Sequence, residues 1–179
     1  NDGGFTNNGT FTKSTSTFIL TGSSANSFIA GSSTTDFYNL SINKSTFGLT
    51  LNSHITVSNT LDMMSMDSLF LNNYTINLGT AGNLNGESAT KHITGKTGGY
   101  IEATRTLNAP SNSNPGNLGA AISSAANMGS TIVRRGHVTQ ANGSVFRYYD
   151  IIPTNNTGLN ASLNFYYLEA ELNGNTEAT

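Results

Sequence analysis

Two aspartates and three histidines are the side chains whose type and spacing first suggest chemistry. Asp62 and Asp67 lie close together in the chain, and a pair of carboxylates can serve as the acid and the base in the hydrolysis of a glycosidic bond. However, one aspartate falls in an expected strand and the other in the following turn, with no Lys or Arg nearby. The histidines His54, His92 and His137 show no short metal-binding spacing. We therefore predict no catalytic residue, no metal site and no cofactor.

The densest group of charges lies further along the chain and consists of Arg134, Arg135, Arg147 and Asp150. Alternation along residues 144–152 places Arg147 and Asp150 on opposite faces of an expected strand. If Asp150 faces the interior it needs a cation, because an unpaired buried carboxylate is costly. Arg134 or Arg135 on the neighbouring strand can supply it through two parallel hydrogen bonds. We predict a structural salt bridge among these four residues, with a carboxylate- or glycan-binding patch as the alternative.

Aromatic residues near the C-terminal end could form a platform that stacks on sugars. They are Tyr148, Tyr149, Phe165, Tyr166 and Tyr167. Trp, the side chain that sugar-binding platforms favour, is absent from the chain. Neighbouring aromatics in a strand point to opposite faces, so we expect these rings to contribute mainly to core packing.

Uncharged polar residues dominate the composition and decide the class of elements that must position these side chains. Asn, Thr, Ser and Gly make up 90 of the 179 residues, whereas charged residues make up only 10%. These four residue types are poor formers of helix interiors, so the composition favours β-structure with many turns. The net charge of −2 argues against a basic surface that would bind nucleic acid. The absence of Cys excludes a disulfide framework. No apolar run is long enough to span a membrane.

Short apolar triplets recur through the first half of the chain, and most alternate with polar residues, which predicts strands. The alternating triplets are Leu40-Ser41-Ile42, Leu49-Thr50-Leu51, Ile55-Thr56-Val57, Leu61-Asp62-Met63 and Ile76-Asn77-Leu78. Pairs of triplets are separated by 20 or 21 residues, namely Leu40 and Leu61, Leu49 and Leu69, Ile55 and Ile76, Leu20 and Leu40, and Ile29 and Leu49. One such period predicts one coil of a β-solenoid. The alternative is an antiparallel sandwich with a strand roughly every 8–12 residues.

The sequence pattern changes after residue 82. Strand-like runs become longer and cover residues 100–107, 130–139, 144–152 and 161–172. Asn142-Gly143 is a typical turn of an antiparallel hairpin. We therefore predict an all-β chain with two parts: a parallel, right-handed β-helix-like solenoid over residues 1–82 and an antiparallel β-sandwich-like or capping module over residues 83–179. A cap would protect the sheet edge that the last coil leaves open.

Several motifs in this order resemble a known group of proteins. In the first half they include Gly9-Thr10-Phe11-Thr12, Phe37-Tyr38-Asn39-Leu40-Ser41-Ile42-Asn43 and Leu71-Asn72-Asn73-Tyr74-Thr75-Ile76-Asn77-Leu78-Gly79. In the second half they include Arg135-Gly136-His137, Arg147-Tyr148-Tyr149-Asp150-Ile151-Ile152-Pro153-Thr154-Asn155-Asn156 and Glu169-Ala170-Glu171-Leu172-Asn173-Gly174. Together they resemble the repeats, and the module that often follows them, in large secreted cell-surface proteins of the Bacteroidetes.

This resemblance implies a bacterial protein exported by type IX secretion and held, secreted or extracellular, at the cell surface. It implies a non-enzymatic structural or adhesive module, and the chain, which begins at Asn1, is then a segment of a longer protein. The implied partners are other copies or neighbouring domains of the same protein, glycans, or secretion and anchoring machinery, with no nucleic acid and no membrane insertion. Asp67-Ser68-Leu69 matches the short O-glycosylation signal of these bacteria, which makes Ser68 a candidate glycan attachment site. The alternative function is a polysaccharide-binding or polysaccharide-degrading β-helix domain.

Overall fold

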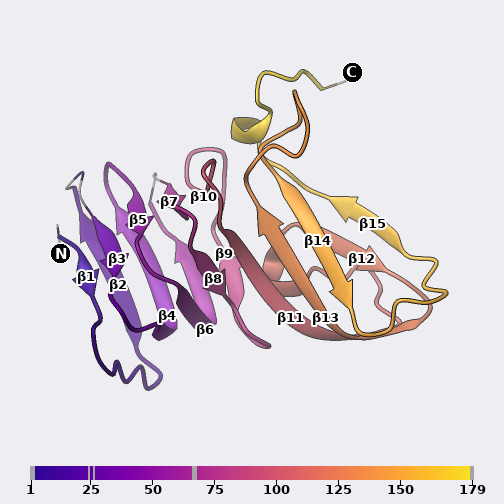
Figure 1. Ribbon diagram of the computed structural model, residues 1–179, viewed down its shortest axis with the longest axis horizontal. Coiled ribbons are helices and arrows are strands. Elements are labelled where there is room, and N and C mark those ends of the chain that lie inside the picture. Colours follow the sequence, from indigo (N-terminus) through magenta and orange to yellow (C-terminus); the bar gives the residue numbers. More distant parts are fainter. Residues whose placement is uncertain (1–2, 24, 26, 66–67, 178–179) are drawn as a thin grey trace.

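The computed structural model describes residues 3–23, 25, 27–65 and 68–177. The chain is all-β and contains a β-solenoid of about four turns, as the sequence period predicts (Figure 1). Each coil contributes a short strand to one sheet and a longer strand to another. The short triplets suit this arrangement, because alternation leaves each strand with one apolar face for the interior and one polar face for solvent.

The strands of the described residues form three sheets. The five-stranded sheet is parallel throughout and consists of β1 (Phe5–Thr6), β3 (Phe28–Ala30), β5 (Leu49–Leu51), β7 (Leu69–Phe70) and β10 (Ile93–Thr94). The eight-stranded sheet consists of β2 (Thr17–Gly22), β4 (Thr35–Lys44), β6 (Ile55–Met63), β8 (Thr75–Asn77), β9 (Asn83–Asn85), β11 (Tyr100–Asn108), β13 (Asn127–Gly136) and β14 (Tyr148–Pro153). A two-stranded sheet pairs β12 (Ala120–Ser123) with β15 (Ser162–Phe165). Two short 3-10 helices are η1 (Pro115–Asn117) and η2 (Glu169–Glu171).

The register of the middle coils is the predicted one. Leu40 lies opposite Leu61, Leu49 opposite Leu69, and Ile55 opposite Ile76.

The prediction for the first coil is wrong by two residues, because Leu20 lies opposite Ile42 and Ile29 opposite Leu51. A shift of two residues keeps every side chain on its own face of the sheet. The apolar pattern alone therefore does not distinguish the two registers.

One hydrophobic core runs through the solenoid and into the strands that follow it. It includes residues as far apart as Leu20 of β2 and Val133 of β13, both almost fully buried. Outside the core, amides stack from coil to coil. Asn59 donates to Asn39 at 2.7 Å, and Asn72 donates to Asn52 at 3.0 Å. The Asn-rich composition thus supplies outward ladders that link one coil to the next.

Aromatic rings fill the N-terminal end of the solenoid. Phe5, Phe11 and Phe18 are half-buried and pack around Phe37, which is buried. The rings of Phe5 and Phe18 have their centroids 4.9 Å apart in an edge-to-face arrangement. The three outer rings retain exposed surface at this end of the molecule.

The parallel sheet continues past residue 82 and then changes direction. β9 pairs with β6, β10 with β7, and β11 with β8, all in parallel. β13 then pairs antiparallel with β11, and β14 antiparallel with β13. Within the described part of the chain, only the two-stranded β12–β15 sheet lies across from these strands, so the structure does not confirm a sandwich-like module, which stays a prediction.

Candidate functional site

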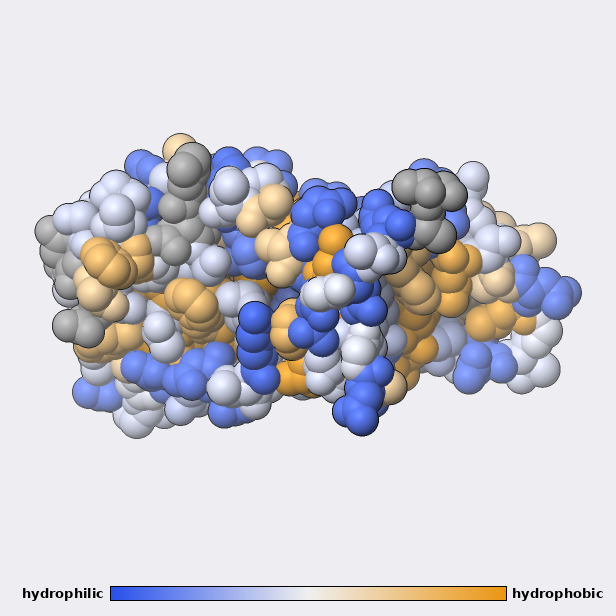
Figure 2. All heavy atoms as spheres, turned by 90° about the horizontal axis from the view of Figure 1, so that it is seen from above, coloured by the Kyte–Doolittle hydropathy of each residue, from blue (hydrophilic) through white to orange (hydrophobic). Residues whose placement is uncertain are grey.

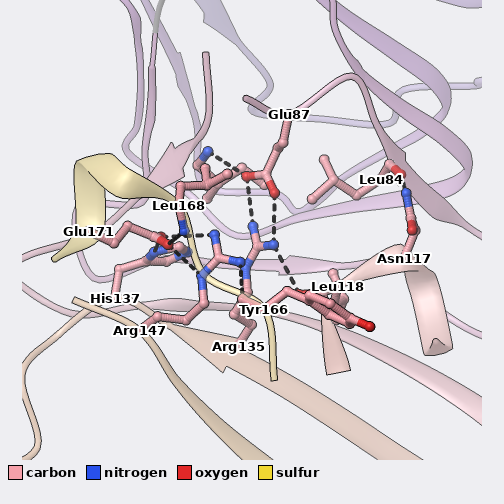
Figure 3. A network of polar contacts seen from close by, with 12 residues as sticks. Leu84, Glu87, Asn117, Leu118, Arg135, His137, Arg147, Tyr166, Leu168 and Glu171 are labelled. Carbon is pink, nitrogen blue, oxygen red and sulfur yellow. Dashed lines mark hydrogen bonds and ion pairs between the residues drawn. The ribbon is translucent and has the colours of Figure 1, made fainter. Parts of the chain in front are cut away.

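A buried ion pair ties the long antiparallel strands to the last coil (Figure 3). Arg135 of β13 is almost completely buried, and its two terminal nitrogens each lie 2.8 Å from one oxygen of Glu87. The same carboxylate accepts the backbone N–H of Ile93 at 2.9 Å, and Arg135 also donates to the carbonyl of Leu118 at 3.1 Å. Burial alone would raise the pKa of Glu87, but the Arg135 guanidinium holds that pKa below its ordinary value.

A second buried cluster fixes the C-terminal 3-10 helix. Glu171 of η2 lies 2.7 Å from Nε of Arg147 and 3.0 Å from Nδ1 of His137, and it accepts the backbone N–H of Leu168 at 2.8 Å. Burial opposes ionisation of Glu171, but His137 and Arg147 lower its pKa to about 2. Burial and, more weakly, Arg135 lower the pKa of His137 to about 4, despite its bond to Glu171. At neutral pH His137 is therefore neutral and donates its Nδ1–H to the carboxylate.

The predicted charged group is divided between different partners. Arg134 pairs with Glu102 at 2.9 Å, whereas Arg135 and Arg147 pair with Glu87 and Glu171. Asp150 lies opposite Arg134 across the strands, but it is exposed and does not face the interior. The three arginines thus take glutamates as their ion-pair partners in place of Asp150.

Sequence reasoning missed these glutamates because each comes from a distant segment. Glu87 lies in the loop between β9 and β10, Glu102 in β11, and Glu171 in η2. Of the three, only Glu102 could have been found from the sequence, because it lies in a strand that pairs antiparallel with the strand that holds Arg134. No sequence pattern pointed to the other two glutamates.

The remaining candidate residues do not gather into one site. Ser68 is half-buried, and its backbone carbonyl accepts the N–H of Leu49 at 2.9 Å. Asp62 accepts a hydrogen bond from Asn85 at 3.2 Å, while Asp67 lies outside the described residues. Within the described ranges no group of three or more His, Asp or Glu side chains could hold a metal ion.

The histidines are likewise scattered. His54 accepts the backbone N–H of Thr75 at 3.1 Å through Nδ1, and its ring lies edge-on to Tyr74. His137 belongs to the buried Glu171 cluster. His92 lines an open groove, so the three rings occupy three different environments.

This groove lies over the outer face of the five-stranded sheet and has a volume of about 560 Å³. Its lining includes Phe70, Asn72, His92, Lys96 and Phe146. The Lys96 ammonium sits 4.2 Å from the centre of the Phe146 ring. Figure 2 shows apolar surface along the solenoid, bordered by hydrophilic side chains. The groove thus combines the exposed ring of Phe70 and the half-buried ring of Phe146 with amide, imidazole and ammonium groups.

Among the described residues that line the groove, the one carboxylate is Glu171, which is already neutralised by Arg147 and bonded to His137. A general acid needs a proton near neutral pH, but the pKa of this group is lowered to about 2. Glu171 is therefore ionised at neutral pH and offers no proton to a ligand in the groove.

Among the described residues no helix is long and apolar enough to cross a membrane. No protein-family model, no curated protein and no solved structure matches this chain.

Proposed function

We propose that the chain is a non-enzymatic structural module of a large secreted bacterial surface protein, serving adhesion or assembly. The observation that carries the proposal is the continuous core, which joins the solenoid to the strands after it. Solenoid coils contact only their neighbours, so a stalk made of them needs a firm connection at each junction. Here the core and the Arg135–Glu87 ion pair together supply that connection.

The surface chemistry supports the same function. Outward positions carry Asn, Thr and Ser, whose amides and hydroxyls hydrogen-bond along the solenoid. Such a surface is hydrated at any ionic strength, because it does not depend on charge. The secreted location and the partners, which are other copies or neighbouring domains, glycans or anchoring machinery, rest on the resemblance to Bacteroidetes surface proteins. O-glycosylation of Ser68 is part of this proposal.

A second candidate function is polysaccharide binding, and the groove over the five-stranded sheet favours it. Phe70 is 43% exposed there and offers a ring face beside the polar groups of Asn72 and His92. Ring faces combined with amide donors suit sugars, which present C–H faces and hydroxyl groups.

A glycan array together with a depolymerisation assay on the purified chain distinguishes the two functions. The structural function predicts no cleavage of any polysaccharide and no selective binding that depends on the groove. Selective binding to one polysaccharide that Phe70→Ala abolishes, but Ile19→Ala leaves intact, would replace the structural function with the second candidate. Ile19 is the matched control because it is an exposed apolar residue of a strand outside the groove.

A further inference from the structure

Both ends of the eight-stranded sheet are open in the described part of the chain. The strand order begins at β14 and ends at β2, so each of these strands is paired on one side only. Figure 1 places them toward opposite ends of the elongated molecule. An unpaired strand edge presents a row of backbone donors and acceptors that another strand can pair with.

At the β14 end of the sheet, inward-facing side chains remain partly exposed to solvent. Ile101, Arg135 and Tyr149 form one inward rung across β11, β13 and β14, and Val133 and Ile151 belong to the next. The residues of β11 and β13 in these rungs are almost fully buried, but Tyr149 and Ile151 are only half-buried. No further strand covers them within the described residues.

The opposite layer is open at the same place. Phe165 of β15 stacks on Tyr149 with a centroid distance of 4.9 Å, so this face of β15 points toward β14. Phe165 is nevertheless 48% exposed, and Leu163 on the same face is 42% exposed. A hollow of about 310 Å³ lies here, lined by Tyr149 and Phe165 among others. Figure 2 shows apolar surface over the C-terminal part as well.

The strand at the other edge of the eight-stranded sheet, β2, has side chains that complement those of β14. β2 and β14 are each six residues long and run in the same direction, because two antiparallel steps separate β14 from the parallel strands. Phe18 and Leu20 point inward on β2, as Tyr149 and Ile151 do on β14. Half-buried rings therefore lie at both ends.

The unpaired backbone N–H and C=O groups at the edge of β2 are also positioned to pair with those at the edge of β14. On β2 the carbonyls of Ser16 and Gly22 bond to β4, so the N–H and C=O of Ile19 point to the free edge. On β14 the N–H of Thr154 bonds to Ser130, so alternate residues, which include Tyr149 and Ile151, point to the free edge.

We propose that copies of this chain join head to tail, with β2 of one copy adding in parallel to β14 of the next. In this register Ile19 lies opposite Asp150, the Ile19 N–H donates to the carbonyl of Tyr149, and the Ile151 N–H donates to the carbonyl of Ile19. Phe18 then covers Tyr149, and Leu20 covers Ile151. Backbone pairing and inward packing are satisfied together, and the sheet continues from one copy into the next.

The contact is heterologous, so it generates an open-ended filament instead of a closed dimer. This inference deepens the proposed structural function and rests on it. Its test is separable, because the glycan array and depolymerisation assay decide the structural function whether or not copies associate.

Light scattering after size-exclusion chromatography of the full chain tests the association. The wild type is expected to exceed 18.8 kDa progressively as its concentration rises. Ile19→Pro removes the edge N–H of β2, and Leu163→Lys places a charge on the exposed apolar face of β15 that also carries Phe165. Each variant alone is expected to be monomeric, and their equimolar mixture is expected to form a heterodimer of twice the monomer mass.

Ile19→Thr keeps the edge N–H and serves as the control for the proline variant, while Met64→Lys controls for the lysine variant. Met64 is 50% exposed and lies outside β2, β14 and β15. Both controls should associate like the wild type. A monomeric wild type at several hundred micromolar, or an Ile19→Pro variant that still self-associates, would overturn the proposal.

Disulfide trapping tests the register independently of variant stability, because the chain contains no native Cys. Opposite residues on paired strands are within disulfide reach. Under oxidation, a mixture of Ile19→Cys and Asp150→Cys copies should form a cross-linked heterodimer, whereas Met64→Cys with Asp150→Cys should not. Equal cross-linking in the two mixtures contradicts the proposed contact.

Discussion

Replacing Arg135 with Met should be among the most destabilising single changes in the chain. The substitution keeps most of the buried volume but leaves the Glu87 carboxylate without the two 2.8 Å contacts that neutralise it. Removing one partner of a buried pair costs about 3–5 kcal/mol. For a chain of this size that free energy corresponds to a fall of about 6–20 °C in Tm. Urea unfolding followed by circular dichroism measures the change.

Two comparisons isolate the cause. The double variant Arg135→Met/Glu87→Leu removes both charges and should recover most of the loss, because the uncompensated carboxylate is gone. Arg134→Met is the matched control, since the Arg134–Glu102 pair is partly exposed and should contribute about 0–1 kcal/mol. Two results would refute this reasoning. One is a free energy of unfolding for Arg135→Met within about 1 kcal/mol of the wild-type value, and the other is a double variant that is no more stable than Arg135→Met alone.

Three further outcomes are expected. The free energy of unfolding should fall as pH drops from about 6.5 to 4, because His137 takes up a proton in the unfolded chain at a higher pH than in the folded chain. In a plot of the urea midpoint against pH, His137→Gln should remove most of this fall. A second fall between about pH 4.5 and 2 should become smaller in Glu171→Gln but not vanish, since the folded pKa of Glu171 is about 2 and the pKa of Glu87 is also lowered. Gly31→Ala should destabilise by more than about 2 kcal/mol, because a Cβ would lie 1.9 Å from the carbonyl oxygen of Asn7 at a φ of +134°. Gly143→Ala, where φ is positive but the space is open, should cost about 1 kcal/mol in the same assay.

The solenoid could be predicted because its determinants are local and repeat. Each coil carries its own alternating triplets, and their spacing fixes the strand that lies opposite, as for Leu49 and Leu69. The first coil was misplaced because a shift of two residues preserves facing, so Ile29 pairs with Leu51 without any change in the apolar pattern.

The charged cluster could be predicted only as a cluster. The arginines are close in sequence, and the expectation that they bind carboxylates follows from the cost of burying a charge. Their actual partners, such as Glu87, lie in loops whose path depends on tertiary packing. Residues 161–172 were predicted as one strand, but the strand ends at Phe165. Glu171 holds the following segment in a 3-10 turn through the N–H of Leu168, a contact that no periodicity reveals.

Native-state hydrogen exchange tests most directly whether the solenoid and the strands after it form one structural unit. We expect the slowest amides of β6 and of β13 to report opening free energies within about 1 kcal/mol of each other, because one core and the Arg135–Glu87 pair join them. If the amides of β13 instead exchange through an opening that costs several kcal/mol less than that of β6, the two parts unfold separately and the account is contradicted.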